Sequence, residues 1–200
     1  PAERDRNTDG RPMGEMELRI TDPSTGDERA TAEVGEVWCR GPEVFVGYLD
    51  ATATDAAFAP GGWYRTGDLG FVDGDGWLTI TGRIKDIVIR GGENIYPREI
   101  EEFLYTHPDI LDAQVVGVPD ARYGEELCAW VRLRPGAPEL TAQALRDYAA
   151  GTLASYKIPR YVHVVAEFPM TVTGKVRKVE MRERSVRLLE LGELAAVRSS

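Results

Sequence analysis

Cysteine and long apolar runs are both scarce in this sequence. Only Cys39 and Cys128 occur in 200 residues, and each stands in an apolar, strand-like context. Two isolated cysteines favour buried thiols in a reducing compartment over a disulfide scaffold or a cysteine-based metal site. The longest uncharged apolar runs, such as Ala113–Pro119, are far shorter than the roughly 20 residues that span a bilayer. These absences predict a cytoplasmic protein without a transmembrane segment.

Positive charge is also scarce, but only in the first part of the chain. The formal net charge is −9, and residues 1–82 carry 7 Lys and Arg against 16 Asp and Glu. Residues 83–200 carry 17 of each sign. Because an acidic surface repels phosphates, the composition excludes nucleic acid and anionic membranes as partners of the first part. The charge balance of the chain therefore changes near Gly82.

The first part reads as short strands and turns. Asp50 is placed to cap a short helix that reaches Phe58. The turn 74–76 has the composition of a hairpin, and the alternative of a calcium loop fails because Trp77 stands where an oxygen ligand belongs. Alternating apolar residues predict strands at Met16–Ile20, Gly35–Gly41, Glu43–Tyr48, Leu69–Asp73 and Trp77–Thr81.

After Gly82 the pattern changes to alternating strands and helices. Strands are predicted at Ile87–Arg90, Leu111–Val118, Glu126–Leu133 and Arg160–Val165. Helices are predicted at Pro97–Tyr105, from Thr141 to about Leu153, and at Arg177–Leu191, where interleaved acidic and basic residues indicate a solvated face. The segregation predicts an α+β fold with a β-rich part first. No proline- or glycine-rich spacer separates the parts, which indicates a tight hinge.

The first of three glycine-containing clusters is Tyr64–Gly70 (YRTGDLG). A carboxylate at Asp68, beside the permissive Gly67, could accept two hydrogen bonds from a vicinal diol such as that of ribose. The alternative is that Asp68 only caps a turn before the next strand.

The second cluster is Gly82–Pro97 (GRIKDIVIRGGENIYP). The fork of Arg83 could bind phosphate or ribose oxygens. Gly91 and Gly92 would let a ligand lie along the backbone. The alternative is a strand and a glycine turn that leads into a helix, with solvated charges.

The third cluster is Pro169–Val176 (PMTVTGKV). It is not a Walker P-loop, because Pro169 replaces the required glycine and Val176 the required Ser or Thr. Lys175 on this turn-prone loop could still neutralise charge as a carboxylate attacks a phosphate. The alternative is an ordinary surface lysine.

The order, spacing and wording of these clusters resemble the adenylate-forming superfamily of acyl-CoA synthetases, luciferases and peptide-synthetase adenylation domains. Gly35–Tyr48 (GEVWCRGPEVFVGY) resembles the segment that precedes the Y-R-T-G-D box in that superfamily. The resemblance runs from about Gly10 to Arg184. It implies that residues 1–82 are the β-rich end of the large adenylation domain and residues 83–200 its small mobile domain.

The resemblance also implies a role for each marked residue. Asp68 would bind both ribose hydroxyls of ATP, and Arg83 would contact ribose and phosphate. Lys85 would be the hinge, and Lys175 would be the mobile lysine that adenylation needs. Gly91 and Gly92 would line the path of the pantetheine arm of coenzyme A.

The implied reaction has two steps. A small-molecule carboxylate attacks the α-phosphate of Mg-ATP to give an acyl-adenylate, and the thiol of coenzyme A then displaces AMP. The ATP loop, the acyl pocket and the magnesium-binding glutamate of the family are not among these residues. We therefore expect Mg²⁺ ligands outside this chain, a missing large-domain portion as its partner, and no activity of this piece alone.

The wording of Lys157–Tyr161 (KIPRY) and of Phe168–Lys175 resembles fatty acyl-CoA synthetases. One alternative is a peptide-synthetase-type adenylation domain that loads a carrier protein, although that branch typically reads closer to Pro-Asn-Gly-Lys at the lysine loop. The other alternative is a non-enzymatic, free-standing binding module.

Overall fold

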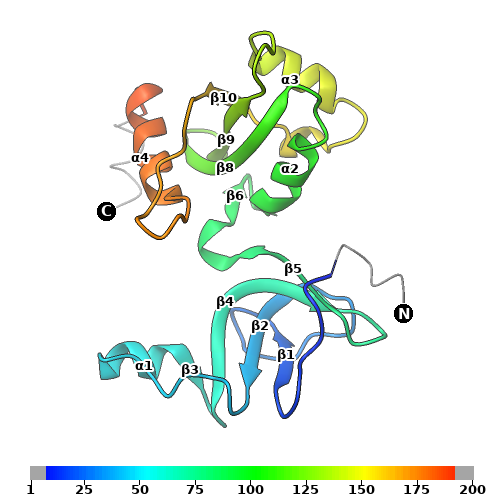
Figure 1. Cartoon of the computed structure of the whole chain (residues 1–200), viewed down its shortest axis with the longest axis vertical. Coiled ribbons are helices and arrows are strands. Elements are labelled where there is room, and N and C mark those ends of the chain that lie inside the picture. Colours follow the sequence, from blue (N-terminus) through cyan, green and yellow to red (C-terminus); the bar gives the residue numbers. More distant parts are fainter. Residues whose placement is uncertain (1–7, 192–200) are drawn as a thin grey trace. The chain divides into compact units, whose positions relative to one another are not determined.

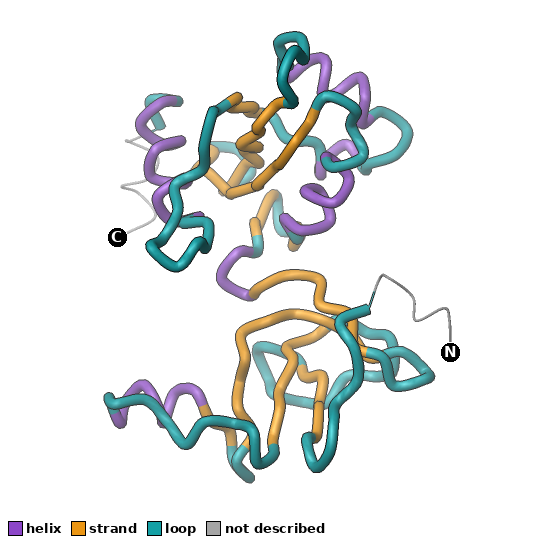
Figure 2. Tube along the Cα trace, viewed as in Figure 1, coloured by secondary structure: helices purple, strands orange, loops and turns teal. Residues whose placement is uncertain are grey.

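The computed structural model describes residues 8–191, and the chain divides into two compact units, Pro1–Lys85 and Asp86–Ser200. The first unit is a β-sheet with one short helix, and the second packs helices on a sheet (Figures 1 and 2). The predicted α+β class is confirmed. Among the described residues, no helix is both long and apolar enough to cross a membrane.

The first unit holds a five-stranded antiparallel sheet in the order β1-β2-β4-β3, with β5 pairing along β4. Its strands are β1 (Glu17–Thr21), β2 (Gly35–Arg40), β3 (Phe58–Ala59), β4 (Trp63–Val72) and β5 (Leu78–Arg83). Helix α1 (Ala51–Ala57) begins as predicted at Asp50, whose side chain accepts a hydrogen bond from the Thr52 amide. The Asp50 cap satisfies one of the free amides at the start of the helix.

The β4–β5 hairpin is closed by a side chain rather than by backbone alone. Asp73 Oδ1 accepts hydrogen bonds from the amides of Asp75 and Trp77 at 2.9 Å each. This arrangement confirms the predicted hairpin. It also fixes the register of β5 against β4, which decides where the residues at the far end of β5 lie.

The second unit is built on a five-stranded mixed sheet in the order β10-β9-β6-β7, with β8 pairing along β9. Strand β10 runs parallel to β9, and the other pairs are antiparallel. The strands are β6 (Val88–Arg90), β7 (Glu93–Ile95), β8 (Ile110–Asp120), β9 (Gly124–Leu133) and β10 (Tyr161–Val164). The helices are α2 (Pro97–Leu104), α3 (Ala142–Ala149) and α4 (Lys178–Leu188).

The sheet of the second unit is buried on both faces. Alternate residues of β9 belong to two different clusters: Leu127, Ala129 and Val131 join the cluster that includes Ile100, Leu104 and Leu145 of α2 and α3. Cys128 and Trp130 join the cluster that includes Met181 of α4. Because side chains alternate across a strand, α2 and α3 cover one face and α4 the other (Figure 1).

Two local predictions were wrong, and two short strands were missed. Glu43–Tyr48 forms no strand, because Phe45 packs its ring on Tyr48 and Tyr64 and the Tyr48 amide bonds to Thr54 Oγ1. The α3 helix ends at Ala149 rather than near Leu153, because Ala150 leaves the helical region with a ψ of 128° and Gly151 follows with a φ of +80°. The missed strands are β3 and β7.

The two thiols differ from the expectation that both are buried. Cys128 is buried in β9, whereas Cys39 in β2 is half-buried. Both thiols are free.

Candidate functional site

Asp68 and Arg83 form an ion pair across the β4–β5 hairpin. They are direct partners in the strand register, and Arg83 Nε donates to Asp68 Oδ1 at 2.8 Å. The Arg83 side chain is 65% exposed and that of Asp68 is 31% exposed. A carboxylate and a guanidinium are therefore held side by side at the end of β5 with their remaining atoms open to a ligand.

A bulge in β4 presents Asp68. Between two register pairs, Glu36 with Leu69 and Trp38 with Arg65, β2 has one residue and β4 has three, residues 66–68. Gly67 adopts a φ of +72° at the middle of the bulge, where a side chain would be strained although space is open. Bulges re-aim side chains beside functional sites, and this one turns Asp68 toward β5.

Thr66 and Glu36 anchor this bulge to β2. Thr66 Oγ1 donates to the Val37 carbonyl at 2.6 Å and accepts from the Asp68 amide at 3.0 Å. Glu36 is only 2% exposed, and its Oε1 accepts from the Gly67 amide at 3.3 Å. Sequence reasoning missed Glu36, because the only signal was one acidic residue next to the apolar run Val37–Cys39.

Lys85 lies in the single 3₁₀ turn Ile84–Asp86 that follows β5. It is exposed, and the boundary between the two compact units falls directly after it. No side-chain ion pair involves Lys85 within residues 8–191. Its position agrees with a pivot, and its hinge role stays a prediction.

Gly91 and Gly92 form the tip of the β6–β7 hairpin in the second unit. Their φ angles are +61° and +91°, so a non-glycine residue would be strained at either position. The Gly91 amide donates to the Tyr123 carbonyl at 2.8 Å. Below the tip, Arg90 lies over the Tyr123 ring at 4.2 Å and donates two hydrogen bonds to the buried Glu126. The pairing with Glu126 raises the pKa of Arg90 above its ordinary value, and the nearby Tyr123 adds to this effect to a lesser extent.

Lys175 lies on a small exposed hairpin of the second unit. The hairpin is closed by the Met170–Val176 bridge and by the Thr171 amide, which donates to the Lys175 carbonyl at 2.8 Å. Thr171 Oγ1 accepts from the Lys175 amide at 3.0 Å and lies 2.9 Å from Thr173 Oγ1. In the part of the chain that the structure describes, no carboxylate pairs with the Lys175 ammonium. Its backbone is therefore ordered while its charge is free to meet an anion.

The structure thus brings Asp68 and Arg83 into contact, with Lys85 two residues further along the chain. Gly91, Gly92 and Lys175 belong to the second unit, where they occupy two separate hairpins. Residues 8–191 contain no group of three or more His, Cys, Asp or Glu side chains placed to hold a metal ion.

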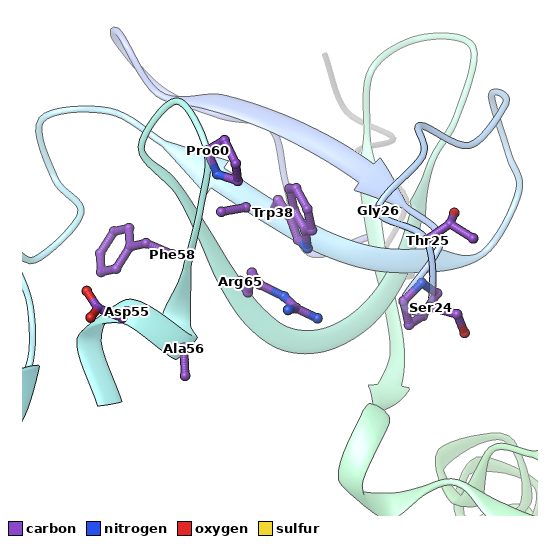
Figure 3. A pocket seen from close by; sticks show the side chains of 11 residues that line it. Ser24, Thr25, Gly26, Trp38, Asp55, Ala56, Phe58, Pro60 and Arg65 are labelled. Atoms are coloured by element: carbon purple, nitrogen blue, oxygen red, sulfur yellow. The ribbon is translucent and has the colours of Figure 1, made fainter. Parts of the chain in front are cut away.

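A separate pocket of about 340 Å³ opens in the first unit (Figure 3). Trp38 and Arg65 line one part of it, and Phe58 and Pro60 line another. None of the predicted site residues lines this pocket. Its link to Asp68 runs instead through Glu36, whose Oε2 accepts from Trp38 Nε1 at 2.9 Å and from Arg65 at 3.3 Å.

The sequence of the chain is similar to those of known proteins. Residues 99–175 match the family described as the AMP-binding enzyme C-terminal domain. The protein that carries the provisional name acyl-CoA synthetase YngI, from Bacillus subtilis, is 48% identical over 92% of this chain and 34% of its own length. The mitochondrial medium-chain acyl-CoA ligase ACSF2 of Danio rerio is 47% identical over 88% of this chain and 29% of its own.

Solved structures share the fold as well. ATP-bound MatB from Rhodopseudomonas palustris superimposes with a TM-score of 0.84 at 38% identity, over 89% of this chain and 35% of that one. The o-succinylbenzoate CoA synthetase MenE of Bacillus subtilis, with its acyl-adenylate bound, gives 0.80 at 34% identity, over 88% and 35%. This chain spans about a third of the length of these relatives.

Proposed function

We propose that this chain is the switching part of an ATP-dependent acyl-CoA synthetase. The proposal starts from its sequence and fold, which are those of the carboxy-terminal region of adenylate-forming enzymes. The observation that carries the proposal is the Asp68–Arg83 pair, an acceptor and a donor fixed side by side beside the unit boundary. The rest of the active site would lie in a preceding large-domain portion. We also propose a cytoplasmic location, which the two free thiols of this chain support.

The first proposed task of the pair is to hold the nucleotide. The partly exposed carboxylate of Asp68 can accept hydrogen bonds from both ribose hydroxyls of ATP. Arg83 engages Asp68 through Nε, and the other donors of its fork suit the ribose or a phosphate oxygen. The pair would orient the nucleotide without taking part in bond making.

Lys175 would serve the first chemical step. A carboxylate oxygen of the substrate bonds to the α-phosphorus of ATP, and pyrophosphate leaves with the electrons of the broken bond. Negative charge crowds the phosphate as the oxygen attacks. An ammonium on an ordered but exposed hairpin can neutralise that charge.

Gly91 and Gly92 would serve the second step, in which the thiol sulfur of coenzyme A bonds to the acyl carbon and AMP leaves. Two adjacent glycines at a hairpin tip leave room for the pantetheine arm to approach the backbone. Rotation at Lys85 would exchange the lysine hairpin for this tip between the steps. We keep Mg²⁺ as a predicted requirement with ligands outside residues 8–191.

Replacement of Asp68 by Asn tests the nucleotide role in the full-length ligase. We expect the affinity for ATP to fall roughly tenfold, because a hydrogen bond to a charged acceptor is worth about 1.5–3 kcal/mol. The matched control is Asp75→Asn in the exposed turn of the same hairpin, which should leave the affinity unchanged. Equal effects of the two substitutions on ATP binding, measured by calorimetry, would refute the assignment.

The acceptor in the second step separates the proposal from its alternative. Over 40% identity to acyl-CoA ligases favours coenzyme A. A peptide-synthetase-type enzyme would transfer the acyl group to a carrier protein instead. Offering each acceptor to the full-length enzyme, with the acyl-adenylate already formed, shows which thioester accumulates; a free-standing binding module would form neither.

A further inference from the structure

Glu36 is a buried carboxylate directly beneath the bulge that presents Asp68. Its side chain is 3% exposed and accepts hydrogen bonds on both oxygens. Oε1 receives the Gly67 amide, and Oε2 receives Trp38 Nε1 and the Arg65 guanidinium. A buried carboxylate is costly unless such donors compensate it, so its presence at the buried start of β2 requires an explanation.

The bulge supplies that explanation. Because β4 has three residues where β2 has one, the Gly67 amide cannot pair with the β2 backbone. Glu36 reaches from β2 to that amide and stands in for the missing backbone acceptor. Thr66 fixes the other side of the bulge through the Val37 carbonyl. The position of Asp68 therefore depends on Glu36 as well as on its own strand.

We propose that Glu36 is a positioning residue for the nucleotide site, which holds the Thr66–Asp68 bulge so that the Asp68 carboxylate meets the ribose hydroxyls. This inference rests on the proposed function of Asp68. Glu36 does not touch the nucleotide; it acts through the Gly67 amide. Trp38 and Arg65, which line the pocket in Figure 3, donate to the other oxygen of the Glu36 carboxylate.

The charge of Glu36 matters because all of its partners are donors. Gly67 N–H, indole N–H and guanidinium can only donate, so all three need acceptors. A glutamine of the same shape offers one oxygen and one NH₂ group. Whichever way the amide turns, its NH₂ group faces a donor. Glu36→Gln should therefore loosen either the Gly67 amide or the Trp38 and Arg65 anchor, without opening a cavity.

The experiment measures ribose recognition rather than activity alone. In the full-length ligase, kcat/KM for adenylate formation is determined with ATP and with 2′-deoxy-ATP, and their ratio is compared between variants. The ratio does not depend on the fraction of folded enzyme. We expect Glu36→Gln to reduce it roughly three- to tenfold, within the range that one hydrogen bond to a charged group supports. Glu17→Gln, which removes an exposed carboxylate paired with Arg40 on the same sheet, is the matched control and should leave the ratio unchanged.

Each outcome decides between positioning and mere scaffolding. Equal loss with both nucleotides, or no loss with either, would overturn the proposal. Thr66→Val removes the second anchor of the bulge and should lower the ratio in the same direction, so it decides the matter if Glu36→Gln is not recovered folded. Asp68→Asn isolates the proposed function: if that variant keeps the wild-type ratio, Asp68 does not read the ribose, and the role of Glu36 falls with it.

Discussion

At the scale of single residues, two buried glutamates contact residues of the marked motifs, and a third contacts the start of α4. Glu36 holds the bulge that contains Asp68, and Glu126 holds Arg90 next to the Gly91 tip. Glu101 accepts from the Val115 amide and from Lys178, three residues after Lys175. Since a buried carboxylate fixes the donors around it, the contacts of Glu36 and Glu126 help to give these exposed motifs a defined backbone.

Cys128 gives a test of burial by pH. Burial raises the pKa of its thiol from the ordinary 9.0 to about 11, so the unfolded chain loses the proton first. Its stabilising contribution is complete below pH 9.0 and is lost as the pH rises to about 11, at a cost on the order of 2 kcal/mol. Urea unfolding of this chain at pH 8 and pH 11 should show that decline.

The matched comparison uses the change in the free energy of unfolding between pH 8 and pH 11, rather than its value at one pH. Cys128→Ala should reduce the alkaline decline more than Cys39→Ala, since Cys39 is only half-buried. An identical decline in wild type and Cys128→Ala would show that ionisation of the Cys128 thiol does not cause the loss of stability.

The sequence was sufficient to mark Asp68, Arg83 and Lys175, because their motifs occur in a fixed order. It was not sufficient to find Glu36. A strand pattern shows that Glu36 and Trp38 share a face, but it does not show that a bulge in a distant strand turns an unpaired amide toward that face. The contact depends on three-dimensional register, which local pattern does not encode.

At the scale of elements, the start of α4 is tied to the rest of the second unit by Lys178. Its ammonium lies 2.8 Å from Glu101 Oε1 on α2 and 3.9 Å from Asp86 Oδ2, next to the unit boundary. The prediction of a solvated face with interleaved charges was therefore wrong at Lys178, whose side chain is 22% exposed.

Lys178→Met tests the importance of this tie. We expect the free energy of unfolding to fall by about 1–3 kcal/mol, because Glu101 keeps its buried charge and loses its cationic partner. The control is Arg98→Met, which breaks an exposed pair with Glu102 on α2, the helix that carries Glu101. It should cost less than about 0.5 kcal/mol. Similar losses for the two variants in urea denaturation would contradict the structural reading.

Elements with strong local signals were predicted well. The Asp50 cap, the 73–77 turn and the apolar run of β9 each determine their own geometry. Glu43–Tyr48 has the composition of a strand, but no neighbouring strand pairs with it, and its aromatic residues pack locally instead. Strand β7 is three residues long and depends on the Gly91–Gly92 turn, so its own sequence carries little signal.

At the scale of the whole molecule, the two compact units divide the proposed work. The first carries the Asp68–Arg83 pair, and the second carries both the hairpin of Lys175 and the hairpin tip of Gly91 and Gly92. A rotation at Lys85 could therefore change which hairpin serves the reaction while the nucleotide pair stays in place. The proposed roles thus assign the residues for the two steps to separate hairpins of one unit.

Separating the two half-reactions of the full-length ligase tests this account most directly. Lys175→Ala should abolish formation of the acyl-adenylate from acid and ATP, and largely spare thioester formation from supplied acyl-adenylate and coenzyme A. Val172→Ala, at an exposed position of the same hairpin, should leave both half-reactions intact. An equal loss of both half-reactions in Lys175→Ala would contradict the account.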